Sequence, residues 1–192
     1  MLHGERVHVR DGGGGDVGQQ RELHGDGNRD GPEPVPVQGY RLPTESEWEY
    51  AYRAGTSTAF YNGVITNTLY DPVDPNLDLI GWYRGNSEVT YSQGFSLDGK
   101  TKGTHAAKGK AANAWGLHDM ASNVWEWAWD RYGTYPGDST DPQGAVSGSS
   151  RVYRGGSCLN YALNARGARR GYDTPDGRGS DLGARLARSR QQ

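Results

Sequence analysis

The sequence predicts one α+β domain with few helices, short strands and much irregular backbone. Only 33% of its 192 residues are hydrophobic, yet it has 6 tryptophans and 12 tyrosines together with 30 glycines. Such a composition requires a core made from a few large aromatic side chains, because each of them buries a wide apolar area. A chain of this length has room for one ordinary domain.

Residues 1–38 differ in amino-acid composition from the rest of the chain. They contain four consecutive glycines, scattered charges and few apolar residues. Such a segment cannot bury enough surface to offset the entropy that ordering its backbone would cost. We expect a flexible or atypical extension at 1–38, ordered only by docking or translated from another reading frame, before a domain at 39–188.

One helix is predicted with clear start and stop signals. The Thr44–Glu47 segment is a capping box, in which a threonine hydroxyl and a glutamate three residues later satisfy free amides of a first turn. Trp48, Ala51 and Tyr52 then share one helical face. Gly55 is placed to end the helix.

Strands are predicted from alternation, and loops from breaker residues. Alternation over 124–129 indicates a half-buried strand whose tryptophan stripe, Trp125, Trp127 and Trp129, is expected to be core rather than a sugar-stacking platform. Further strands are expected within 151–157 and 182–187. Between 56 and 112 the sequence predicts loops and short strands, with turns at the Asp-Pro pairs 71–72 and 74–75 and a buried piece at 80–83.

Charge and cysteine content exclude several classes of protein. The net charge is −2, so no basic face for nucleic acid is expected. No apolar run is long enough to span a bilayer, and the N-terminus lacks the apolar core of a secretory signal, so we expect a soluble chain. A single cysteine, Cys158, rules out a disulfide within the chain and a Cys-rich zinc site, and leaves the compartment unknown.

Three blocks resemble one known family. Residues 39–51 (GYRLPTESEWEYA), 113–127 (NAWGLHDMASNVWEW), and 151–157 with 183–186 (RVYRGGS and GARL) are similar, in this order, to signatures of the formylglycine-generating-enzyme (sulfatase-modifying factor) family. The resemblance implies a C-type-lectin-like α+β fold over 39–188. The N-terminal half that members usually possess is not recognisable here.

The resemblance implies an oxidase only where two cysteines lie shortly after the third block and hold copper. Two soft thiolates suit Cu(I), and one thiolate cannot form such a site. Cys158 stands where the family has an aromatic residue, at neither catalytic position. We therefore expect no copper and no catalysis, with Cys158 as a small, half-buried apolar residue.

Calcium is a candidate structural ion by the same resemblance. Family members that bind it use a side-chain oxygen, two main-chain carbonyls and a glutamate, at positions that match Asp119, Ser122, Val124 and Glu126. Hard oxygen ligands on a loop suit this ion. The alternative is that Asp119 and Glu126 only accept hydrogen bonds from backbone amides. Ser122 replaces a family glycine, which would strain a turn that requires positive φ.

The segment 158–184 resembles the variable region of proteins from diversity-generating retroelements. Its frame matches theirs at Ala162, Asn164, Arg166, Ala168, Arg170, Pro175, Asp176, Arg178, Gly183, Arg185 and Leu186. The residue types at the positions between these frame residues all have a codon that is reached from the asparagine codon AAC by changing adenines alone. The adenine-directed mutagenesis of such retroelements would produce this pattern. An ordinary polar, glycine-rich loop is the alternative. The candidate ligand-binding positions are Cys158, Leu159, Asn160, Tyr161, Leu163, Asn164, Gly167, Arg169, Gly171, Tyr172, Asp173, Gly177, Gly179, Ser180 and Asp181.

Together these features predict a non-catalytic binding module. Tyr161 and Tyr172 would act as anchors, with Asn160, Asp173, Ser180 and Asp181 as polar contacts to a protein or other macromolecule. Two alternatives stay open: a copper or iron oxidoreductase with an altered site, and a truncated relative without function.

Overall fold

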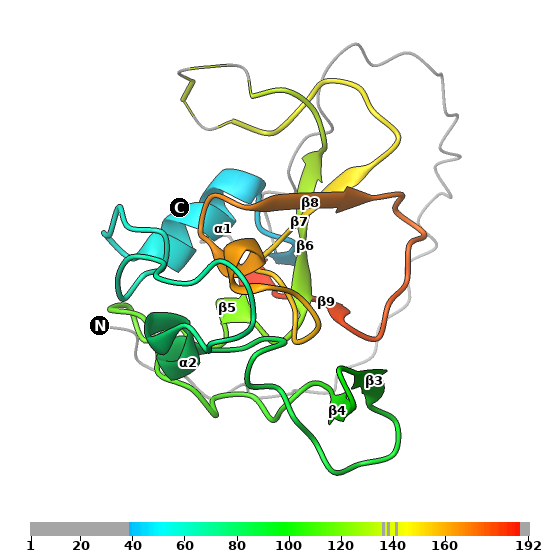
Figure 1. The fold of residues 1–192 in the computed structure, drawn as a ribbon. Coiled ribbons are helices and arrows are strands. Elements are labelled where there is room, and N and C mark those ends of the chain that lie inside the picture. The colour runs from blue at the N-terminus through cyan, green and yellow to red at the C-terminus, as the bar shows by residue number, and fades with distance from the viewer. Residues whose placement is uncertain (1–38, 136, 138, 141, 189–192) are drawn as a thin grey trace, which may run out of the picture.

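The structure is a computed structural model, and it describes residues 39–188 except 136, 138 and 141. The extension predicted at 1–38 lies outside the described residues. Figure 1 shows short strands and helices joined by long irregular segments, as the glycine-rich composition predicts.

The largest sheet has four strands in the order β8-β7-β6-β9. Strand β6 (Trp125–Arg131) pairs antiparallel with β7 (Arg151–Arg154) and parallel with β9 (Leu182–Ala184). Strand β8 (Arg170–Asp173) pairs antiparallel with β7 and forms the opposite edge. The strands predicted at 124–129, 151–157 and 182–187 are thereby confirmed, whereas β8 is a strand that the alternation does not predict.

Helix α1 (Glu45–Arg53) packs on β6 and β7, and it begins with the predicted capping box. The Glu47 amide donates to Thr44 Oγ1 at 3.2 Å, and the Thr44 amide donates to Glu47 Oε2 at 2.8 Å. The helix ends one residue earlier than the glycine signal suggests, because Ala54 already adopts the left-handed conformation with φ of 45°.

A second helix, α2 (Pro75–Ile80), corrects the turn predicted at 74–75. Asp74 caps it by accepting hydrogen bonds from the amides of Asn76 and Leu77, at 3.0 and 2.9 Å. Proline is well suited to the first helical position, since its missing N–H has no partner there. The same Asp-Pro pair therefore starts a helix rather than a turn.

Three two-stranded pairs and a 3-10 turn complete the described fold. The pairs are β1 (Tyr40–Arg41) with β10 (Ala187–Arg188), β2 (Gly81–Trp82) with β5 (Ala121–Ser122), and β3 (Phe95–Leu97) with β4 (Lys100–Lys102). The 3-10 turn η1 spans Ala162–Ala165.

The core is aromatic, as the composition predicts. Its buried members are Trp48, Tyr52, Phe60, Tyr61, Leu77, Ile80, Tyr83, Met120, Ala121, Ala162 and Ala165. They come from α1, α2, β5, η1 and the segments between, so irregular backbone is held by packing rather than by long ladders. Among the described residues no helix is long and apolar enough to cross a membrane.

Of the tryptophan stripe of β6 only Trp125 is buried, so the expectation that the stripe is core is confirmed for Trp125 and is wrong for Trp127 and Trp129. The buried face of this strand carries Glu126, Ala128 and Asp130 toward α1, while Trp127 and Trp129 stay partly exposed. Trp125 and Trp127 pack instead on Tyr153 of β7, with ring centroids 4.8 and 5.5 Å away.

Candidate binding site

The segment 158–184 joins the two edges of the large sheet. It leaves the buried glycine pair after β7, forms η1 and edge strand β8, and returns to β9 at the opposite edge (Figure 1, orange to red). Because β8 ends beside Arg151 and β9 begins beside Trp125, residues 174–181 run between opposite ends of the sheet.

The candidate positions differ in exposure. The exposed ones are Tyr161, Arg169, Tyr172, Asp173, Gly179 and Ser180. The partly buried ones are Leu159, Asn160, Leu163, Asn164, Gly171, Gly177 and Asp181. The buried ones are Cys158 and Gly167. A side chain can contact a surface ligand only from the first two groups.

Cys158 and Gly167 therefore do not present a contact surface in this conformation. Cys158 is 0% exposed rather than half-buried, and its burial raises the pKa of the thiol to about 12. A Cβ at Gly167 would lie 2.9 Å from the ring of Tyr52, so this position serves core packing.

Tyr161, the first predicted anchor, rests on residues outside the segment. Its ring stacks on Tyr70 at a centroid distance of 5.6 Å, and the Arg84 guanidinium lies over both rings, 4.8 Å from Tyr70 and 5.3 Å from Tyr161. Asp98 holds that guanidinium through two hydrogen bonds of 2.8 Å. The anchor is 36% exposed and pre-oriented.

Tyr172, the second anchor, is supported in the same way. It is 54% exposed and stacks on Tyr132 at 4.0 Å, beyond the end of β6. Arg170, two residues earlier, lies 4.7 Å from the Tyr132 ring and 4.1 Å from the Tyr135 ring. Both anchors thus stack on tyrosines that no candidate position includes.

Asn160 is used inside the loop. Its Oδ1 accepts hydrogen bonds from the amide and the hydroxyl of Ser157, at 3.1 and 2.9 Å. The acceptor oxygen of Asn160 therefore fixes the turn after β7, which leaves the amide nitrogen as the group that could reach a ligand.

Three of the four candidate calcium ligands already accept hydrogen bonds from the protein through oxygens that the ion would use. Both oxygens of Glu126 already accept hydrogen bonds from Arg185, and Oε2 also accepts one from Trp48 Nε1 at 2.7 Å. Asp119 Oδ2 accepts the Lys108 amide at 2.7 Å, and the Ser122 carbonyl accepts the Val124 amide at 3.0 Å.

Ser122 nevertheless marks the site of the missing family glycine. Its φ is 61°, the positive value that would strain a non-glycine residue, and its buried Oγ has no hydrogen-bond partner among the described residues. The Ser122 hydroxyl does not replace the Glu126 oxygens as a ligand, because it is one neutral group and those oxygens already accept hydrogen bonds from Arg185. This loop is therefore held by its own hydrogen bonds and by Arg185.

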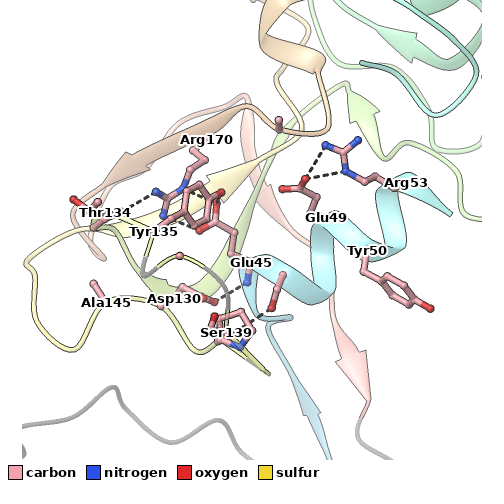
Figure 2. A pocket seen from close by; sticks show the side chains of 16 residues that line it. Glu45, Glu49, Tyr50, Arg53, Asp130, Thr134, Tyr135, Ser139, Ala145 and Arg170 are labelled. Atoms are coloured by element: carbon pink, nitrogen blue, oxygen red, sulfur yellow. Dashed lines mark hydrogen bonds and ion pairs between the residues drawn. The ribbon is translucent and has the colours of Figure 1, made fainter. Parts of the chain in front are cut away.

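A pocket of about 490 Å³ lies beside β8, and no sequence pattern indicates it. Helix α1, the segment after β6 and the start of β8 line it (Figure 2). Its residues include Glu45, Glu49, Tyr50, Asp130, Tyr135 and Arg170. Because α1 lies about 80 or more residues before the other segments, no local pattern could reveal the pocket.

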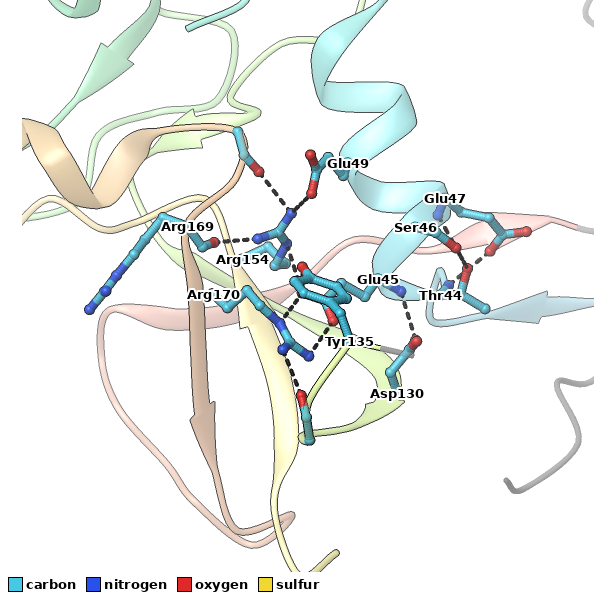
Figure 3. A network of polar contacts seen from close by, with 12 residues as sticks. Thr44, Glu45, Ser46, Glu47, Glu49, Asp130, Tyr135, Arg154, Arg169 and Arg170 are labelled. Atoms are coloured by element: carbon cyan, nitrogen blue, oxygen red, sulfur yellow. Dashed lines mark hydrogen bonds and ion pairs between the residues drawn. The ribbon is translucent and has the colours of Figure 1, made fainter. Parts of the chain in front are cut away.

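Glu45, Glu49 and Arg170 of this pocket belong to an ion-pair network (Figure 3). Arg170 donates to both oxygens of Glu45, at 2.7 and 2.8 Å, and to the Gly133 carbonyl at 2.7 Å. The fully buried Arg154 lies 3.4 Å from Glu45 Oε1 and pairs with Glu49. A buried arginine with two carboxylates fixes α1 against β7 and β8.

The short strands, the single capped helix on the sheet and the long irregular connections define a C-type-lectin-like α+β domain. Residues 13–190 match the family described as "Sulfatase-modifying factor enzyme 1-like domain", and the chain belongs to this family. The match begins upstream of the boundary predicted at residue 39, and the resemblance carried by the three blocks is confirmed.

Relatives include enzymes and a variable protein. Formylglycine-generating enzymes of Streptomyces coelicolor and Mus musculus are 36% and 32% identical over 156 and 155 residues, 78% of this chain in each case. The chain spans only 46% and 39% of their lengths. The solved structure "Treponema denticola variable protein 1" is 36% identical with a TM-score of 0.65, over 80% of this chain and 49% of that one.

Proposed function

We propose that this chain is a non-catalytic binding protein whose segment 158–184 is a diversified ligand-binding surface. The observation that carries the proposal is that frame residues attach the segment to the domain while candidate contact residues are exposed. Three frame residues, Ala162 and Arg170 in the segment and Arg185 directly after it, are buried or ion-paired to the body of the domain, whereas Tyr161 and Tyr172 are exposed. Such a segment can change its contact residues while its attachments stay in place.

The likeness to the Treponema denticola variable protein supports this role, since that structure shares both the fold and 36% of the aligned residues. The chemistry of Cys158 supports it too. It is the only thiol in the chain and is fully buried, so the chain cannot supply the two thiolates of a copper site.

The chemistry of the surface favours a macromolecular ligand. Exposed tyrosines with small polar neighbours provide rigid contact area and adaptable hydrogen bonds. The exposed Arg169 and Arg178 are offset by the exposed Asp173 and Asp176, so the exposed residues of the segment carry no excess positive charge for nucleic acid. A protein is therefore the ligand class we propose.

Site-specific photo-crosslinking tests this proposal. A photoreactive amino acid is placed at Tyr161 or Tyr172 in the full chain, with Glu88 on the β3–β4 side as the matched control position. In extracts of the source cells, both surface positions should give the same covalent partner and the control position should give none. Equal labelling from all three positions, or from none, would refute the binding role of the segment.

A second candidate function is supported by the 32% and 36% identity to formylglycine-generating enzymes. It is tested by incubating the copper-treated chain with a cysteine-containing sulfatase-type peptide and following the peptide by mass spectrometry. We expect the peptide to remain unmodified, because this chain offers one buried thiol. Conversion of its cysteine to formylglycine would establish the enzymatic role.

A further inference from the structure

The pocket beside β8 is built without any candidate variable position. Its wall residues on β8 and just before it, Arg170 and Ala168, belong to the frame, and the rest come from α1 and from the described residues between Asp130 and Ala145. The exposed Arg169 and Tyr172 stand next to it along the chain. A fixed pocket therefore adjoins a changeable surface, and the nature of its polar groups indicates what it can hold.

The two glutamates of the pocket are already neutralised. Glu45 Oε1 accepts hydrogen bonds from Arg170 Nε at 2.7 Å and from Tyr135 Oη at 3.2 Å, and its Oε2 accepts one from Arg170 Nη2 at 2.8 Å. Glu49 pairs with Arg53 at 2.8 Å and with Arg154. Both carboxylates therefore already have a cationic partner within the domain.

Asp130 differs from both glutamates because it forms no ion pair with any of the described residues. It is 3% exposed, and its Oδ2 accepts the amide of Glu45 at 2.6 Å. Apart from its own backbone amide, the described residues offer it no other hydrogen-bond or ion-pair partner. Figure 2 shows Asp130 in the pocket at the N-terminus of α1, close to Glu45, Tyr135 and Arg170. A buried carboxylate without a cation is costly unless a ligand supplies one.

We infer that this pocket binds a primary ammonium group on an unbranched alkyl stem, as a lysine side chain of the partner protein provides, with Asp130 Oδ1 as its acceptor. The lysine would be a fixed anchor for partners whose remaining contacts the variable surface selects. The role of the lysine as an anchor for the partner protein rests on the proposed function. The binding of an ammonium group in the pocket does not rest on it.

The shape of the acceptor favours ammonium over guanidinium. A guanidinium fork requires both oxygens of a carboxylate, and here Oδ2 is occupied by the helix amide. An ammonium group is a point charge that one oxygen can hold. The pocket also offers Tyr50, Tyr135, Ala145 and Ala168 to pack along an alkyl stem.

The pH dependence of binding provides a second signature. Among the described residues, the charged and titratable groups around Asp130 and its pocket are Glu45, Glu49, Tyr50 and Arg53 on α1, Arg154 and Arg170 on β7 and β8, and Tyr135. Burial raises the pKa of Asp130 to about 6, with a smaller contribution from the Glu45 charge, against the hydrogen bonds from backbone amides and the charge of Arg170. The anion, and with it the ammonium site, is therefore present at pH 7.5 and largely lost at pH 5.

The test uses the full chain labelled with 15N and the probe Nα-acetyl-lysine-N-methylamide. At pH 7.5 the probe should shift amides of α1, of residues 130–135 and of 168–170. The Nε-acetylated probe, which has the same stem and no charge, should shift none of them. Binding should weaken roughly tenfold between pH 7.5 and pH 5.

Asp130→Asn should abolish binding of the probe, while its side-chain oxygen still accepts the hydrogen bond from the Glu45 amide. The control is Glu88→Gln, which removes an exposed charge elsewhere and should leave binding of the probe unchanged. Equal binding of both probes, or unchanged binding by Asp130→Asn, would overturn the inference. If Asp130→Asn fails to fold, the comparison of the two probes and the pH series, both measured on the unmodified protein, test the inference. None of these results depends on the variable surface, so failure here leaves the crosslinking test intact.

Discussion

The guanidinium of Arg185 and the carboxylate of Glu126 form a two-pronged ion pair across the domain. Arg185 Nη2 donates to Glu126 Oε1 at 2.8 Å, and Nε donates to Oε2 at 3.0 Å. Nη2 also donates to the carbonyls of His118 and Asp119, at 3.0 and 3.3 Å. The Glu126 side chain is only 7% exposed, so the cation that neutralises it is part of the chain itself.

Replacing Arg185 by Met should destabilise the fold, because Glu126 would be left buried without its cation. We expect a loss of about 3 kcal/mol in the free energy of unfolding, measured by urea denaturation. Arg178→Met, at an exposed position, is the control and should change the value by less than about 0.5 kcal/mol. Similar values for the two variants would show that the ion pair contributes nothing.

Calcium should leave the melting temperature of the protein unchanged, since Arg185 already occupies the oxygens of Glu126. The measurement compares thermal melts in excess calcium and in excess chelator. A ligand that binds only the folded state raises the melting temperature. A rise on adding calcium would therefore show that the ion displaces the guanidinium and that the ligand set implied by the family resemblance operates here.

Asp130→Asn should stabilise the protein above pH 6. Burial raises the pKa of Asp130 to about 6, so the folded state holds its proton more tightly than the unfolded state does. Stability from this group is complete at low pH and is lost as the pH rises from about 4 to 6. The variant should gain on the order of 2 kcal/mol over the wild type at pH 8, and nothing at pH 4.

Urea denaturation at the two pH values measures this difference. Asp71→Asn, which removes an exposed charge, is the control and should change the free energy of unfolding equally little at both pH values. A wild type more stable than Asp130→Asn at pH 8 would mean that the amide of Glu45 and the charge of Arg170 outweigh the effect of burial.

Gly171→Ala should destabilise the fold although 171 is a candidate variable position. A Cβ there would lie 1.9 Å from Cε2 of Tyr153, so that ring must move. We expect a loss of about 1–3 kcal/mol in urea denaturation. Gly179→Ala, where the nearest atom would be Asp181 Oδ1 at 3.1 Å, should be close to neutral. Equal stability of both variants would show that Tyr153 yields freely and that position 171 accepts any residue.

Local chemistry makes α1 and β6 predictable. The capping box of Thr44 and Glu47 is contained in four residues, and the alternation of β6 in seven. Helix α2 escapes such a prediction because Asp74-Pro75 fits both a turn and a helix start, and the short segment behind it has too few residues to separate them.

Long-range packing makes the remaining features unpredictable. Which face of β6 is core depends on where α1 lies, and the Trp48–Glu126 hydrogen bond that draws Glu126 inward joins residues 78 positions apart. The pocket around Asp130 likewise needs α1 and β8 in place. In the candidate site the residue types indicate contact positions, but only the fold separates exposed Tyr172 from buried Cys158.

Sequencing the DNA around the gene is the shortest route to deciding whether segment 158–184 is a diversified binding surface. We expect a near-copy of the stretch encoding residues 157–186 beside a reverse-transcriptase gene, differing only where the copy has adenine. Those differences should include the codons of Tyr161 and Tyr172. If no copy exists, or if the differences fall on all four bases, the segment is not diversified and the chain is a fixed member of its family.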